Sequence, residues 1–138
     1  MTQEQKDLLL KDLCCRLPYG VKIKTPSDCW TSEEDICELK EIFKGDDGLF
    51  RIGDIGALIE YSKPYLFPFS SMTEEQRKEY ESLCIKNTSE CTDLYSIVFP
   101  KDYYDTVESI DYLYKNHIDI RGLIPMGLAE DATELNIY

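Results

Sequence analysis

The sequence predicts an α+β fold in a single globular domain spanning residues 1–138. A chain of 138 residues, 43% of them hydrophobic, can bury roughly two thirds of its unfolded surface around its own core. Strand-like alternation is concentrated at residues 20–61, and helical periodicity lies on either side of it. Separate runs of strands and helices indicate an α+β protein, with a small, mainly antiparallel sheet on which an N-terminal helix and two later helices pack.

The first element is a helix from Thr2 to Leu17. Thr2 can cap it, with Gln5 three residues later as in a capping box, and leucines follow at helical spacing. Pro18 ends the helix. Cys14 and Cys15 are neighbours, so on a helix they point about 100° apart. We expect both to be buried structural thiols.

A half-buried strand follows at residues 20–25, where Val and Ile alternate with two lysines. Residues 32–44 allow two interpretations. An acidic start after Ser32 is typical of a helix, whereas the turn sequence Gly-Asp-Asp-Gly at 45–48 favours a hairpin that joins residues 39–44 to residues 49–53. The hairpin explains the turn and both flanks, so we predict strands. Residues 57–61 are predicted as a further short strand.

Residues 62–83 organise the rest of the chain. Pro64 and Pro68 cannot donate backbone hydrogen bonds, so the first half is predicted to be extended and poorly paired. Side chains should alternate there, and we expect Phe67 to be exposed. The members expected to be buried are Leu66, Phe69 and Met72.

The second half of this segment is predicted to be a charged helix from Thr73 to Cys84, with Thr73 and Gln76 as its capping box. A strand is expected at residues 93–99 and a helix at residues 101–116. Residues 117–129 are too apolar for a free tail. Residues 130–138 should lie over the surface or fray.

Composition excludes several classes of function. The formal net charge is −12, and no basic run interleaved with aromatic residues is present, so direct nucleic-acid binding is disfavoured. An acidic surface can imitate nucleic acid, but most small acidic proteins are simply well solvated. No stretch is apolar enough to span a membrane. The start of the sequence lacks a signal-peptide pattern, which favours a cytoplasmic protein.

The six cysteines include no Cys-x-x-Cys pair, and the single histidine lies far from all of them in sequence. Structural zinc sites use closely spaced ligands. We therefore expect reduced thiols, no metal and no cofactor.

Two kinds of site remain. Exposed aromatic side chains beside the organising segment could contact a protein partner, and the candidates are Tyr61, Tyr65 and Phe67. The alternative is a polar site formed by His117, Asp119 and Arg121, which share a face if the segment is extended and could bind an anion or move a proton. A purely structural role would instead place His117 at a helix end and pair Arg121 with a carboxylate. No nucleophile lies nearby in sequence, so we predict a binding protein and not an enzyme.

The segment Lys-Pro-Tyr-Leu-Phe-Pro-Phe-Ser-Ser-Met-Thr-Glu-Glu at 63–75 resembles the KPYLRPMSSMTEE segment of a family of small uncharacterised proteins from gut Bacteroidales and their phages. Residues 12–14, 17–21 and 117–124 also match, in the same order. Phe67 stands where the family has arginine. The resemblance implies a bacterial or phage cytoplasmic setting and supplies no catalytic residues. Partner identity and oligomeric state do not follow from the sequence.

Overall fold

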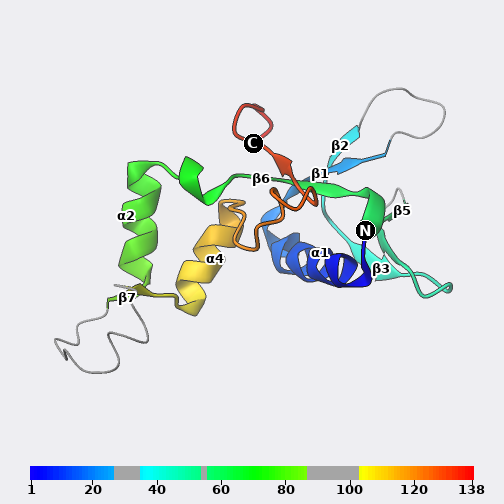
Figure 1. The fold of residues 1–138 in the computed structure, drawn as a ribbon, viewed down its shortest axis with the longest axis horizontal. Helices are drawn as coiled ribbons and strands as arrows, with labels where there is room; N and C mark the ends of the chain where they lie inside the picture. The colour runs from blue at the N-terminus through cyan, green and yellow to red at the C-terminus, as the bar shows by residue number, and fades with distance from the viewer. Residues whose placement is uncertain (27–34, 54–55, 87–102) are drawn as a thin grey trace.

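The computed structural model describes residues 1–26, 35–53, 56–86 and 103–138, and it has the α+β architecture that the sequence predicts (Figure 1). Helices α2 and α4 lie side by side at one end of the molecule, while α1 and the larger sheets lie towards the other. Strand β6 connects the two ends. The predicted strand at 93–99 lies outside the described residues.

The three α-helices within the described residues begin at capping boxes, of which two were predicted. Helix α1 spans Gln3–Arg16 and α2 spans Glu74–Leu83, each capped by a threonine paired with a glutamine three residues later. Helix α4 spans Val107–Lys115. It starts later than predicted because Tyr103–Tyr104 form β8, which pairs with β7 (Ile85–Lys86). Single 3₁₀ turns follow α1, β5 and β6: η1 (Leu17–Tyr19), η2 (Ile59–Tyr61) and η3 (Phe69–Ser71).

The four-stranded sheet corrects the prediction for the organising segment. Its order is β2-β1-β6-β9, with β2 at Asp35–Glu38, β1 at Lys22–Thr25, β6 at Lys63–Leu66 and β9 at Glu130–Asp131. Strand β6 is therefore internal to the sheet and not poorly paired. Its antiparallel pairing with β1 covers Lys63 and Pro64, and its parallel pairing with β9 covers Tyr65 and Leu66. Pro64, which lacks an N–H, lies only in the pairing with β1. The pairing with β9 uses other residues of β6 and is unaffected.

The predicted hairpin is confirmed. Strand β3 (Ile42–Lys44) pairs with β4 (Phe50–Ile52) across the Gly-Asp-Asp-Gly turn, and β4 pairs with β5 (Ala57–Leu58). Residues 35–38 are also strand, so the helical alternative for this region is wrong wherever the structure describes it. The expected strand at 57–61 is shorter, since η2 replaces its second half.

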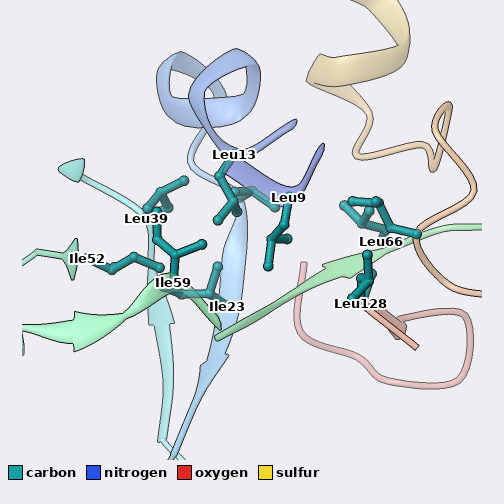
Figure 2. Close-up of a cluster of buried hydrophobic side chains, with 11 residues drawn as sticks. Leu9, Leu13, Ile23, Leu39, Ile52, Ile59, Leu66 and Leu128 are labelled. Carbon is teal, nitrogen blue, oxygen red and sulfur yellow. The ribbon is translucent and has the colours of Figure 1, made fainter. Parts of the chain in front are cut away.

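Two groups of buried apolar side chains hold the elements together. The main core lies between α1 and the sheets (Figure 2) and contains Leu9, Leu13, Val21, Ile23, Leu39, Ile52, Ile59, Leu66, Leu123, Leu128 and Ala129. A second core, between α2, α4 and the segment after β6, contains Met72, Leu113 and Ile118, with Phe67 and Tyr80 packed against it. The neighbours Leu66 and Phe67 thus point into different cores, as successive residues of an extended chain do.

Several burial predictions need correction. Leu66 and Met72 are buried as expected, but Phe69 is exposed and Phe67 is half-buried against the second core. The segment turns into η3 at Phe69, which ends the alternation on which the prediction relied. Cys14 and Cys15 are also exposed, because the buried stripe of α1 passes through Leu9, Leu13 and Arg16 instead.

Candidate functional site

A groove with several apolar side chains in its lining lies beside the N-terminal half of α1. It has a volume of about 230 Å³, and we call it the α1 groove. Leu10, Leu49, Phe50, Leu58 and Ile59 supply its apolar side chains, while Gln3, Lys6, Asp7, Gly48 and Glu60 complete the lining. Three separate segments meet here because α1 packs against η2 and the β3–β4 turn projects alongside.

The β3–β4 turn presents two of these apolar residues to solvent. Leu49 and Phe50 are both exposed, although β4 continues into the fully buried Ile52. Asp47 fixes the turn by accepting hydrogen bonds from the Leu49 backbone N–H, at 3.1 Å, and from the Arg51 guanidinium. The guanidinium holds the pKa of Asp47 well below its usual range. The exposed leucine and phenylalanine are therefore held in place by their own turn.

One ion pair crosses the α1 groove. The Lys6 ammonium contacts the Glu60 carboxylate, joining α1 to η2 at the level of the apolar lining. Asp7 accepts a hydrogen bond from Gln3 Nε2 at 2.9 Å. The charged lining therefore comprises one cation and two anions.

The three residues predicted to contact a partner differ in burial. Tyr61 is exposed and directly follows Glu60, at the side of the α1 groove. Tyr65 is buried, so it is not available to a partner. Phe67 is half-buried against the second core, and its ring lies 5.7 Å from that of Tyr138. These three side chains do not form one exposed patch, because Tyr65 pairs with β9 in the sheet and Phe67 is held by an isolated bridge to Ile118.

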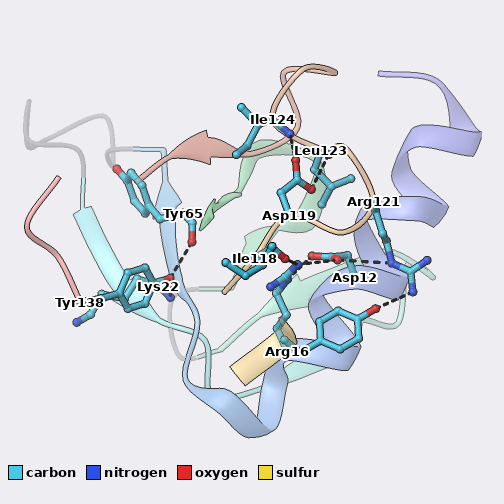
Figure 3. A network of polar contacts seen from close by, with 11 residues as sticks. Asp12, Arg16, Lys22, Tyr65, Ile118, Asp119, Arg121, Leu123, Ile124 and Tyr138 are labelled. Carbon is cyan, nitrogen blue, oxygen red and sulfur yellow. Dashed lines mark hydrogen bonds and ion pairs between the residues drawn. The ribbon is translucent and has the colours of Figure 1, made fainter. Parts of the chain in front are cut away.

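His117, Asp119 and Arg121 do not form one face. The backbone at His117 has φ 57°, which breaks the extended conformation on which the prediction depended. Asp119 accepts hydrogen bonds from the backbone N–H groups of Leu123 and Ile124, at 2.8 and 2.9 Å, as Figure 3 shows. Arg121 points the other way, towards α1 and Tyr114. Each of the three side chains serves a different structural contact.

Arg121 instead joins a buried polar network that the sequence analysis missed. Arg16 donates from Nε to Asp12 at 2.6 Å and from Nη2 to the Ile118 carbonyl at 2.8 Å (Figure 3). Arg121 Nε lies 3.5 Å from the same Asp12 carboxylate, and Arg121 Nη2 donates to the Tyr114 hydroxyl. The Tyr114 ring covers the Arg16 guanidinium at 5.0 Å. The i, i+4 spacing of Asp12 and Arg16 was a usable signal. The pairing of Arg121 with Asp12 agrees with the structural role that the sequence analysis set against the polar site.

Tyr138 fastens the C-terminal segment over His117. The two rings stack 4.1 Å apart, and the Tyr138 hydroxyl donates to the Tyr65 carbonyl and accepts from the Lys22 N–H. Burial raises the pKa of Tyr138 to about 12. Burial and the nearby positive charge of Arg16 lower the pKa of His117 to about 4. The segment 130–138 is thus attached at both β9 and Tyr138, which agrees with the first of the two expected alternatives, a segment lying over the surface.

The described residues contain neither a cluster of metal ligands nor a membrane-spanning helix. Within residues 1–26, 35–53, 56–86 and 103–138, no group of three His, Cys, Asp or Glu side chains is placed to hold a metal ion. No helix in that same part of the chain is long and apolar enough to cross a membrane. Among the cysteines that the structure describes, Cys14, Cys15 and Cys84 are free thiols.

Comparisons of the chain with protein-family models, with curated proteins and with solved structures found no match.

Proposed function

We propose that this protein is a non-catalytic accessory module of a bacterial or phage cytoplasm that binds a protein partner through the α1 groove. The observation that carries the proposal is the exposed pair Leu49 and Phe50 on a turn held by Asp47, beside a concave apolar surface. Exposed apolar side chains gathered at a concavity are typical of protein contact sites.

The size of the α1 groove favours a peptide side chain over a metabolite. Pockets for small molecules usually measure about 300–1,000 Å³, whereas this groove measures about 230 Å³. That volume suits one or two anchoring side chains of a partner segment. The described lining contains no Ser, Thr, Cys or His, so the groove offers no common nucleophile with a neighbouring base.

The polar residues considered as an enzyme site support the same choice. Both carboxylate oxygens of Asp119 accept hydrogen bonds from backbone N–H groups. Arg121 forms an ion pair with Asp12 and donates a hydrogen bond to Tyr114. Neither side chain is free to meet a substrate without breaking a contact that holds the fold. The net charge of −12 also favours a protein partner over nucleic acid.

An affinity capture with matched variants tests the proposal. The wild-type protein, Leu49→Glu and Leu135→Glu are immobilised and exposed to a bacterial cytoplasmic extract at two salt concentrations. Leu49 and Leu135 are 47% and 43% exposed, so the second variant controls for adding a charge at an exposed leucine outside the groove. We expect proteins captured by the wild type and Leu135→Glu to be lost with Leu49→Glu. Identical capture by all three would overturn the proposal.

A further inference from the structure

The charges of the α1 groove identify the chemistry of its occupant. Building on the proposed function, we infer that the groove takes a peptide segment in which an apolar side chain lies next to a lysine or arginine. The apolar side chain packs on Leu49 and Phe50, and the cation pairs with Glu60. Three observations support this assignment: the resident ion pair, the balance of charge in the lining and the charge of the whole chain.

The first observation is that Glu60 already holds a cation in this position. Lys6 supplies it from α1, and the two side chains remain 38% and 24% exposed. Exposed ion pairs contribute only about 0–1 kcal/mol, so releasing Lys6 into water costs little. A partner's lysine or arginine can replace it and keep the Glu60 carboxylate neutralised. Arginine suits the site best, because its planar guanidinium can donate two parallel hydrogen bonds to a carboxylate.

The second observation is the balance of charge once Lys6 is displaced. Lys6 is the only cation among the described lining residues, and Asp7 and Glu60 are the anions. Two basic residues flank the turn outside the lining: Arg51 is paired with Asp47, and the Lys44 ammonium lies over the Phe50 ring, 5.6 Å from its centroid. A partner segment therefore meets two carboxylates beside an apolar surface. An acidic segment would place like charges together, which costs affinity and selects against it.

The third observation is the field of the whole molecule. A net charge of −12 attracts basic segments and accelerates their association at low salt. The same charge opposes a second copy of this chain as the occupant, because two copies repel each other. A second copy in the groove remains a separate outcome that the experiment below can detect.

The test is a selection from a random ten-residue peptide library displayed on phage, carried out against the wild-type protein. Peptides that also bind Leu49→Glu are removed, and those that bind Leu135→Glu are kept. We expect the selected peptides to carry an apolar residue next to lysine or arginine. Selected peptides whose apolar residue is flanked by acidic or uncharged residues would overturn the inference while leaving the proposed function intact. Failure to enrich any peptide that depends on Leu49 would overturn both.

Point variants then test the role of Glu60 with the best selected peptide, labelled with fluorescein and measured by fluorescence anisotropy. In the Lys6→Gln background, where no resident cation has to be displaced, Glu60→Gln should weaken binding about fivefold, the effect of losing one partly exposed ion pair. Glu130→Gln is the matched control, since Glu130 also pairs with lysine and is 34% exposed, and it should bind as the wild type does. Lys6→Gln should bind equally well or more tightly. Equal affinity for Lys6→Gln with and without Glu60→Gln would overturn the inference.

Sedimentation velocity of the wild type and Leu49→Glu identifies the remaining alternative. We expect both proteins to sediment as monomers in the absence of peptide. A wild-type dimer that Leu49→Glu dissociates would assign the groove to a second copy of the chain and overturn the basic-peptide inference.

Discussion

Asp12 and Arg16 form an ion pair on successive turns of α1 in which neither side chain has any surface exposed to solvent. Arg121 approaches the same carboxylate from a segment far along the chain. One buried carboxylate therefore serves two guanidinium groups, of which Arg16 is fully buried and Arg121 is partly exposed. A buried ion pair of this kind adds little net stability compared with apolar residues, but removing one partner leaves an uncompensated charge.

Replacing Asp12 with alanine should therefore be among the most damaging single changes. We expect Asp12→Ala to lower the free energy of unfolding by about 3–5 kcal/mol, because Arg16 would remain buried without its counter-ion. Urea denaturation followed by circular dichroism measures the change. Asp46→Ala, at an exposed position of the β3–β4 turn, is the control and should change stability by less than about 0.5 kcal/mol. Equal stability of the two variants would contradict the role assigned to Asp12.

His117 should make the protein less stable in mild acid. Its pKa is about 4 in the folded protein, below the value of 6.5 for an unperturbed histidine, so the unfolded chain binds the proton more readily between those two values. The contribution of His117 to the free energy of unfolding is fully present above pH 6.5 and is lost as the pH falls towards 4. The loss is about 3 kcal/mol, at 1.36 kcal/mol for each unit of pKa shift.

The variant His117→Asn isolates this contribution, since asparagine tolerates a positive φ and does not titrate. Urea midpoints of both proteins are compared from pH 7 to pH 4. Carboxylates titrate in the same pH range. The contribution of His117 is therefore the difference between the two curves of urea midpoint against pH. Parallel curves would show that His117 is not the titrating group.

Removing the Tyr138 hydroxyl should loosen the C-terminal segment. Tyr138→Phe keeps the ring stacked on His117 but leaves the Tyr65 carbonyl and the Lys22 N–H without this partner. We expect a loss of about 1–2 kcal/mol in the free energy of unfolding. Amide hydrogen exchange should also quicken at Lys22. Tyr61→Phe, which alters an exposed tyrosine, should leave both measurements unchanged.

Phe67 and Phe69 should respond to mutation in the reverse of the order that the sequence predicted. Phe67 packs against the second core, so Phe67→Arg should unfold the protein or lower its melting temperature strongly. Phe69 is exposed and meets Tyr80 edge to face at 5.8 Å. Phe69→Ala should therefore cost only about 0.5–1.5 kcal/mol. Differential scanning calorimetry ranks the two, and a larger effect of Phe69→Ala would contradict the observed packing.

The predictions that succeeded depended on signals within a few residues. Thr2 with Gln5 and Thr73 with Gln76 mark helix starts by local hydrogen bonds, and the Gly-Asp-Asp-Gly sequence marks a turn. None of these requires knowledge of a distant partner. Local chemistry was sufficient for the starts of α1 and α2 and for the hairpin, and helical periodicity predicted α4 with a start that was too early.

The predictions that failed depended on contacts between distant segments. Pro64 suggested an unpaired strand, but β1 and β9 approach β6 from opposite sides at different residues. The predicted face of His117, Asp119 and Arg121 required extended backbone, and the positive φ at His117 removes it. The α1 groove combines residues from α1, the β3–β4 turn and the β5–η2 segment. No local pattern reports that these three segments meet.

The position of β6 inside its sheet also bears on how fast the protein folds. The bond from Arg16 to the Ile118 carbonyl closes a loop of 102 positions, and the bond from Tyr138 to Tyr65 closes one of 73. Contacts of such long sequence separation cost loop-closure entropy before they stabilise anything, and they slow folding. Helices α1 and α2 can form early from their own caps. The four-stranded sheet is complete only when β9, in the last quarter of the chain, pairs with β6. We expect that step to limit the folding rate.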